Sequence, residues 1–134
     1  MNNRIIHISQ IRSGISNEKQ SDKNTLFVEL DGKAIQDEET FIKELLLAFK
    51  YPWNNPVLKI GWLTDYMKDL LWIDQRNIVL IIRHYNSMLI TNPYLKRRIE
   101  DEFQDVVLPW WEYEVVGHMV DGFTRGFIVY LVDD

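Results

Sequence analysis

The side chains of this sequence that could do chemistry are mainly carboxylates and tryptophans, and the most informative of them lie within residues 61–73. At about 100° per residue, the apolar positions of this stretch predict a helix with one core face, formed by Leu63, Tyr66, Met67, Leu70 and Leu71. The opposite side of this helix carries Asp65, Lys68 and Trp72, with Asp69 at its edge.

This acidic strip carries two features that a helix normally avoids. Asp65 and Asp69 are four residues apart, which makes their carboxylates neighbours on the helix surface. Like charges at that spacing cost roughly 0.2–0.5 kcal/mol, and an exposed Trp72 lowers solubility. A helix that tolerates both is a candidate docking surface for a cationic partner. The alternative is a solvated helix with one poorly shielded aromatic side chain.

The sequence contains no complete catalytic, metal-binding or phosphate-binding constellation. Its three histidines are scattered, and His118 with Glu114 forms at most half of a metal site. Ser87 follows His84 by three residues, but no carboxylate or oxyanion hole can be assigned to complete a triad. The sequence has no cysteine, which excludes thiolate chemistry, and no glycine-rich phosphate loop. We therefore expect a protein that is not an enzyme and that uses no metal and no cofactor.

Paired carboxylates nevertheless leave one enzymatic alternative open. The candidate pairs are Asp65 with Asp69, Asp101 with Asp105 and, more loosely, Glu112 with Asp121. General acid–base catalysis needs one carboxyl group in an apolar environment and one in a wet environment, and the sequence gives no sign of this difference. A small acidic enzyme that uses a carboxylate pair therefore remains an alternative to a binding protein.

The five tryptophans are too many for a chain of 134 residues to bury completely. Trp111 falls in a predicted core stripe, which leaves its neighbour Trp110 partly exposed. Trp53 lies in a connector between Pro52 and Pro56, so it is either a lid over the core or an anchor of an interface.

The composition is that of one globular domain, with 46% hydrophobic residues and a formal net charge of −5. This acidic balance argues against nucleic acid or an anionic membrane as a partner and is compatible with a basic protein partner. The first residues lack the apolar core of a signal peptide, and no run approaches the roughly 18 apolar residues of a membrane span. We expect a soluble cytoplasmic protein that is a monomer when free.

The chain divides into an N-terminal extension, residues 1–24, and one domain, residues 25–134. The alternating run Arg4–Ile8 in the extension could add an edge strand, and a polar loop follows it. The domain begins with a predicted strand, Leu26–Leu30. A helix then begins after the predicted N-cap Asp37 and stops before Pro52.

The second half of the chain contains two continuous apolar runs, Ile78–Ile82 and Phe127–Val132, which are typical of strands covered on both faces. Two helices are predicted between them. The first begins at Pro93, and its buried stripe is Leu95, Ile99, Phe103 and Val106. The second begins at Pro109, and its stripe is Trp111, Val115, Met119 and Phe123.

This order of elements predicts an α/β fold with a three-stranded, mainly parallel sheet. About four helices cover the faces of the sheet in a three-layer arrangement. A fourth strand is added if residues 4–8 pair with the sheet.

Three segments of the sequence resemble the barstar family, the intracellular inhibitors of the secreted ribonuclease barnase. Residues 30–35 (LDGKAI) resemble the family's first strand and the turn after it, and residues 49–52 (FKYP) resemble the end of its first helix. Residues 65–73 (DYMKDLLWI) resemble the D-x-L-x-D-L-x-W-[LI] pattern of its second helix. The order of elements from Leu26 to Val132 is similar as well.

The resemblance implies a barstar-like domain that binds a nuclease through the second helix and the loop before it, with Asp65 at the main enzyme-contacting position. The sequence departs from the family pattern just before this helix. The loop at residues 53–57 is one residue longer, Lys59 replaces an asparagine, and Gly61 replaces a second acidic contact. A lysine there opposes a cationic active site, which argues against tight inhibition of a barnase-like enzyme. The alternative target is a different toxin, recognised by a re-tuned version of the same face.

We therefore expect a stoichiometric inhibitor of a basic protein, most simply a nuclease or another toxin. The expected contacts are Asp65 at the centre, Asp69 and Trp72 beside it, and Trp53 and Trp62 as apolar anchors. The alternative is a barstar-like binding module that belongs to another protein assembly and inhibits no nuclease.

Overall fold

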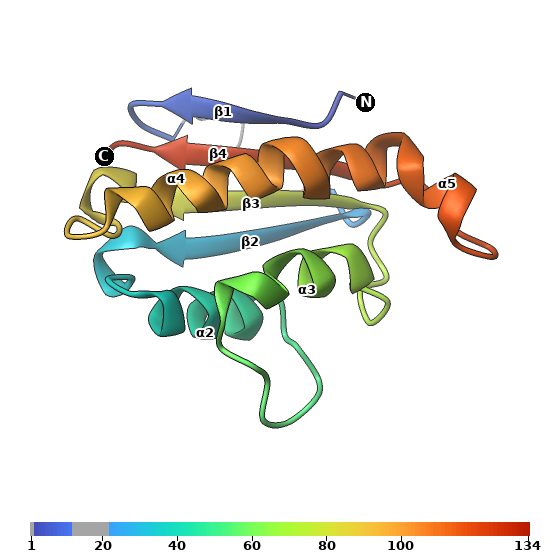
Figure 1. The fold of residues 1–134 in the computed structure, drawn as a ribbon. Helices are drawn as coiled ribbons and strands as arrows, with labels where there is room; N and C mark the ends of the chain where they lie inside the picture. Colours follow the sequence, from blue (N-terminus) through green and yellow to red (C-terminus); the bar gives the residue numbers. More distant parts are fainter. Residues whose placement is uncertain (1, 12–21) are drawn as a thin grey trace.

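The computed structural model describes residues 2–11 and 22–134, and in this part of the chain four strands form one parallel sheet (Figure 1). The strands are β1 (Arg4–Ile8), β2 (Thr25–Asp31), β3 (Asn77–Arg83) and β4 (Gly126–Val132). They lie in the order β1-β4-β3-β2, and every neighbouring pair is parallel. The predicted mainly parallel sheet is confirmed, and the N-terminal run pairs with β4 as an edge strand. Most of the polar loop that we predicted between residues 13 and 24 lies outside the described residues.

The central position of β3 follows from its sequence. Ile78, Leu80, Ile81 and Ile82 are all buried, so side chains on both faces of the strand are covered. A strand buried on both faces needs no polar alternation, which explains the continuous apolar run. The strand lies between β2 and β4, as this pattern predicts.

Helix α2 (Glu38–Ala48) begins where the sequence predicts it. Asp37 accepts a hydrogen bond from the backbone N–H of Thr40, whose hydroxyl accepts one from the backbone N–H of Asp37, so the two residues form a capping box. The helix buries Phe41 and Leu45 against the sheet. It ends at Ala48, and Lys50 then adopts a positive φ of 58°, so the helix stops before Pro52.

One long helical segment covers the sheet between residues 93 and 118 (Figure 1). It consists of α4 (Pro93–Glu102), the π-helical turns η4 (Phe103–Val107) and η5 (Trp110–Glu114), and α5 (Val115–His118). The prediction that Pro109 starts a new helix is wrong, because Pro109 lies within this continuous segment between the two π turns.

The π turns also shift the buried stripe away from its predicted positions. In each of them a backbone N–H bonds to the carbonyl five residues earlier, so the helix takes more residues per turn. An even four-residue stripe stays buried, formed by Phe103, Val107, Trp111 and Val115. Val107 is therefore buried, whereas the predicted core residue Val106 is exposed. For the same reason Trp110 and Trp111 are both buried, and the prediction of a partly exposed Trp110 is wrong.

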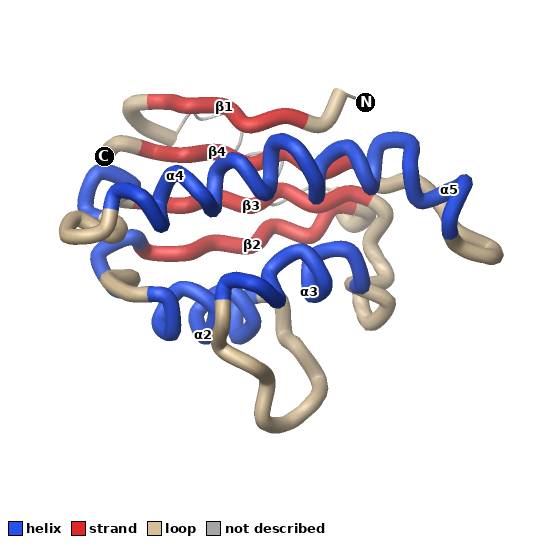
Figure 2. Tube along the Cα trace, viewed as in Figure 1, coloured by secondary structure: helices blue, strands red, loops and turns tan. Residues whose placement is uncertain are grey.

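The helical segments pack against one face of the sheet (Figure 2). The main core joins their apolar side chains to Val28, Leu80 and Val129 and their neighbours on that face. A second, smaller cluster lies on the other face, around Ile8 and Ile81, and among the described residues it contains no helical member. We had expected helices over both faces. Side chains from all four strands, together with Ile11, form the second cluster without them.

No helix in the described part of the chain has the length and apolar character needed to cross a membrane.

Candidate partner-binding surface

The predicted acidic helix exists, but it is shorter than the sequence pattern suggests. A 3₁₀ turn, η2 (Ile60–Trp62), leads into α3 (Leu63–Asp69), and Leu70 then adopts a left-handed conformation with φ 47°. A left-handed residue ends a helix because it turns the chain away from the helical path. Leu71 therefore points outward and is exposed, although the helical pattern predicts it in the core. Trp72 lies beyond the helix, so its predicted position on one strip with Asp65 is wrong.

The two aspartates of α3 remain on its surface. Asp65 is exposed and Asp69 is half-buried, and neither forms an ion pair with any residue that the structure describes. The intervening Lys68 places its Nζ 4.3 Å from the ring centre of Trp110, in a cation–π contact. The positive charge of Lys68 is therefore directed towards the long helical segment.

An aromatic cluster joins the three tryptophans that we expected at the surface. Tyr51 makes edge-to-face contacts with Trp53 and Trp72, at ring-centre distances of 5.4 and 5.5 Å. Its ring is also 5.2 Å from that of Tyr66, which in turn lies 6.2 Å from Trp62. Trp53 and Trp62 are about half exposed, at 55% and 48% of their surface. Sequence analysis missed Tyr51, the residue at the centre of this cluster.

Trp72 has a mainly supporting position within the cluster. Its indole N–H donates a hydrogen bond of 2.8 Å to the carbonyl oxygen of Phe49, and its ring lies 5.6 Å from that of Trp53. It therefore fixes the end of α2 to the turn that follows α3.

Two side chains hold the loop between α2 and α3, Glu38 from α2 and Tyr66 from α3. The hydroxyl of Tyr66 accepts a hydrogen bond from the backbone N–H of Val57 (2.8 Å) and donates one to its carbonyl oxygen (3.0 Å). Burial raises the pKa of this phenol, so it remains protonated and can donate. Glu38 accepts a hydrogen bond of 2.8 Å from the backbone N–H of Ile60. Its carboxylate also lies 3.9 Å from Nζ of Lys59, so this lysine faces a negative charge.

The opposite end of α3 is fixed by two residues of the last third of the chain. The indole N–H of Trp111 donates a hydrogen bond of 2.7 Å to the carbonyl oxygen of Met67. The guanidinium of Arg125 donates to the carbonyl oxygens of Leu70, Ile73 and Gln75. Arg125 is 3% exposed, and this burial lowers the pKa of its guanidinium. No sequence signal marks this role, because an arginine just before a strand is ordinary on a protein surface.

An apolar groove of about 330 Å³ lies beside Trp53. Its walls come from α2 and from the loop that Tyr66 holds, and it is lined by Glu39, Lys43, Leu46, Leu47, Tyr51, Trp53, Pro56 and Leu58. The exposed face of Trp53 is thus one wall of a groove rather than an isolated aromatic side chain.

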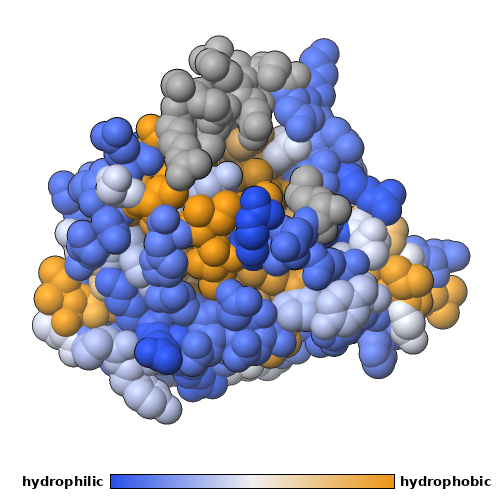
Figure 3. Space-filling model, turned by 90° about the horizontal axis from the view of Figure 1, so that it is seen from above, coloured by the Kyte–Doolittle hydropathy of each residue, from blue (hydrophilic) through white to orange (hydrophobic). Residues whose placement is uncertain are grey.

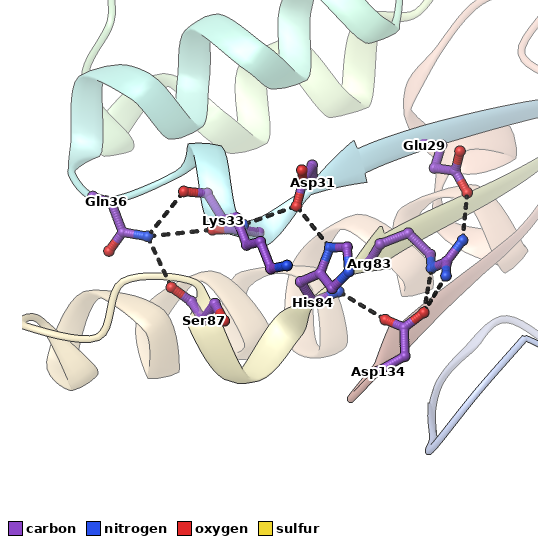
Figure 4. Close-up of polar contacts among 9 residues, drawn as sticks. Glu29, Asp31, Lys33, Gln36, Arg83, His84, Ser87 and Asp134 are labelled. Carbon is purple, nitrogen blue, oxygen red and sulfur yellow. Dashed lines mark hydrogen bonds and ion pairs between the residues drawn. The ribbon is translucent and has the colours of Figure 1, made fainter.

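A second group of polar side chains lies at the carboxyl ends of the strands, where α/β proteins often bind ligands (Figure 4). Asp31 contacts Nδ1 of His84 at 2.9 Å, and Arg83 forms an ion pair with Asp134. The backbone N–H of His84 also donates to Asp134. These pairs join the ends of β2, β3 and β4, and the charges of Arg83 and Asp134 neutralise one another.

The candidate catalytic and metal-binding residues among the described residues lack the features that such sites require. Asp101 and Asp105 are both exposed, so this carboxylate pair lacks the two unlike environments that acid–base catalysis requires. In the described residues, no three His, Asp or Glu side chains lie close enough together to hold a metal ion. His118, which we considered as half of a metal site, is stacked on Trp110.

The parallel sheet with helices on one face and the α3 surface define a small α/β domain of a known class. The family model described as barstar (barnase inhibitor) matches residues 25–121. Because this match covers most of the sequence, the chain belongs to the barstar family. The barstar-like fold that the sequence predicted is therefore confirmed.

The other comparisons add no functional information. No curated protein matches the chain. Two solved structures of the Aeropyrum pernix ORC2 protein, as ADPNP–ADP complexes and in the ADP form, are similar to it at 16% identity, with TM-scores of 0.47 and 0.49. The matches cover 100% and 98% of this chain but only 36% of each ORC2 chain, so this chain spans about a third of their length. Similarity at this level supports no conclusion about function.

Proposed function

We propose that this protein is a stoichiometric inhibitor that binds a basic nuclease, or another basic toxin, through α3 and the loop before it. The observation that carries the proposal is the pair of surface carboxylates, Asp65 and Asp69, on the helix of a barstar-family domain that corresponds to the family's binding helix. The proposed compartment is the cytoplasm, and the free protein is proposed to be a monomer.

The charges around α3 support a cationic partner. The carboxylates of Asp65 and Asp69 have no ion-pair partner among the described residues, whereas Lys59 faces Glu38 and Lys68 lies over Trp110. A net charge of −5 adds a long-range attraction for a basic protein. Such attraction mainly accelerates association, while a few desolvated contacts determine how long the complex lasts.

The aromatic cluster supports a role in holding that complex. Trp53 and Trp62 each expose about half of their surface, and large aromatic side chains at the centre of an interface often contribute most of its binding energy. Trp72 is proposed to flank the contact and to hold Trp53 in place. Because Tyr66 and Glu38 fix the loop, little conformational entropy is lost when a partner binds.

The proposal is tested by affinity capture from cells that encode the chain, with the wild-type protein and Asp65→Ala as parallel baits. We expect a basic nuclease or toxin on the wild-type bait, a strong reduction on Asp65→Ala, and full recovery on Asp105→Ala. Asp105 is a suitable control because it is an equally exposed aspartate on the long helical segment. The purified partner should then lose its activity at one equivalent of the wild-type chain.

The same experiment separates the two alternatives. A partner that binds through Asp65 but keeps its activity, or that has none, would identify the chain as a binding module of another assembly. Equal recovery of all partners on the three baits would contradict the proposed surface and reopen the carboxylate-pair enzyme.

A further inference from the structure

Four large apolar side chains are exposed together at the end of the molecule where α3 and α5 stop. They form what we call the apolar patch, and their exposed fractions are 68% for Leu71, 47% for Met119, 94% for Val120 and 40% for Phe123. All four line one hollow of about 80 Å³, together with the charged residues Lys68, Asp69, Asp121 and Arg125. Hydrophobic surface is visible at the right of Figure 3, the side on which α5 lies in Figure 1.

The sequence pattern assigns three of these residues to the core, and the backbone explains why they are exposed. Leu70 ends α3 in a left-handed conformation, which turns Leu71 outward. The helix α5 ends at His118, and Met119 is extended, so Met119 and Phe123 leave the buried stripe that Trp111 and Val115 begin. The predictions of a buried Leu71, Met119 and Phe123 are therefore wrong. Exposed apolar side chains gathered in one place are typical of interaction surfaces.

The backbone under the apolar patch is held in one shape. The N–H of Gly122 donates a hydrogen bond to the carbonyl oxygen of Met119, and a Cβ at Gly122 would lie only 2.8 Å from the carbonyl oxygen of Val115. The buried guanidinium of Arg125 lies 5.0 Å from the ring centre of Phe123. The turn that presents Val120 is thus anchored on both sides.

The border of the apolar patch carries charges of both signs, because Lys68 and Arg125 line the hollow beside Asp69 and Asp121. Asp69 and Asp121 have no ion pair with a described residue. The neighbouring cations are occupied, since Lys68 lies over Trp110 and Arg76 lies 5.3 Å from the ring centre of Phe123 while donating to the carbonyl oxygen of Thr124. The surface therefore offers an apolar centre between carboxylates.

The apolar patch is continuous with the proposed partner-binding surface. Asp69 belongs to α3, four residues after Asp65, and it also lines the hollow at the centre of the apolar patch. A partner whose basic residues reach both aspartates would cover Leu71 as well.

We infer that the inhibited partner carries an aliphatic or aromatic protrusion, flanked by Lys or Arg, that binds the apolar patch. This inference rests on the proposed function, because it assigns a second region to the same partner. It adds that the partner is recognised by its shape and apolar contacts in addition to its positive charge. A basic protein without such a protrusion would therefore bind weakly.

The test uses two double variants of equal chemistry at opposite ends of the long helical segment. Leu71→Ser with Val120→Ser removes the two most exposed side chains of the apolar patch. Ile90→Ser with Tyr94→Ser is the control, because these residues are 65% and 80% exposed near the start of α4. The probe is the purified basic protein that is recovered with the wild-type chain. Its dissociation constant and its association rate are measured at several salt concentrations, and the oligomeric state of each free variant is measured by sedimentation.

We expect Leu71→Ser with Val120→Ser to raise the dissociation constant about tenfold or more, mainly through faster dissociation, with an unchanged salt dependence of association. The control pair should bind like the wild type. Unchanged binding of the patch variant, while Asp65→Ala still weakens the complex, would overturn the inference and leave the proposed function intact. A wild-type dimer that the patch variant converts to a monomer without loss of partner binding would also overturn it, because a second copy would then be the occupant. If Asp65→Ala binds the probe like the wild type, the proposed function fails instead.

Discussion

The phenol of Tyr66 holds both polar groups of the Val57 backbone, accepting from its N–H at 2.8 Å and donating to its carbonyl oxygen at 3.0 Å. One core side chain of α3 thus fixes the loop that carries Trp53. The same ring contacts Tyr51 and Trp62, so the position of the aromatic cluster depends on it.

Replacing Tyr66 by Phe keeps the ring but leaves both groups of Val57 without this partner. We expect the free energy of unfolding to fall by about 1–2 kcal/mol, the usual cost of losing such hydrogen bonds in a partly buried site. The amide of Val57 should exchange faster with solvent, and binding of the partner should weaken severalfold because the loop must then be ordered on binding. Urea unfolding and amide exchange measure these effects. Tyr94→Phe is the control, since Tyr94 is 80% exposed, and an equally large loss there would contradict the assignment.

Arg125→Met removes the donor of three backbone carbonyls around the end of α3. We expect the free energy of unfolding to fall by about 2–4 kcal/mol, because the carbonyl oxygens stay buried without a partner. The control Arg97→Met, whose side chain is 80% exposed, should change it by less than about 0.5 kcal/mol. Urea unfolding of the two variants gives the comparison. A stability of Arg125→Met equal to that of the wild type would show that burying the charge costs as much as its hydrogen bonds contribute.

The ion pair of Arg83 with Asp134 makes stability depend on acid pH. The guanidinium lowers the pKa of Asp134 from its ordinary 3.8 to about 2 in the folded protein. A carboxyl group with a lowered folded pKa stabilises the fold above its ordinary pKa, and this contribution is lost as the pH falls from about 4 towards 2. We expect Asp134→Asn to flatten the decline of stability in that window, as measured by unfolding at several pH values. The neighbouring Asp133→Asn should keep the wild-type slope, and an unaltered slope in Asp134→Asn would refute the assignment.

Much of the fold could be predicted because local signals and long-range packing agree in it. The Asp37 cap, the apolar run of β3 and Pro93 at the start of α4 each satisfy a requirement that depends on a few neighbouring residues. The family pattern in residues 65–73 identified the helix that carries Asp65.

The errors arise where one residue changes the backbone path. Each π turn of the long helical segment adds a residue to the spacing, which moves the core position from Val106 to Val107 and buries Trp110. The left-handed Leu70 ends α3 early and separates Trp72 from Asp65. The left-handed Leu70 has no local sequence signal such as glycine. Pro109, which cannot donate a hydrogen bond to the carbonyl four residues earlier, lies between the two π turns, where we predicted a helix start. The tertiary contacts of Trp111 and Arg125 with the end of α3 stabilise the observed path, and periodicity alone does not contain those contacts.

The central claim, binding of a basic partner through α3, is tested most directly by calorimetric titration of the captured partner with the wild-type chain, Asp65→Ala and Asp105→Ala. We predict one binding site per chain, a loss of more than about 1 kcal/mol in binding free energy for Asp65→Ala only, and a thermal midpoint of that variant close to the wild-type value. Unchanged affinity of Asp65→Ala, or a large drop in its thermal midpoint, would contradict the account, because Asp65 would then be either outside the interface or part of the fold's support.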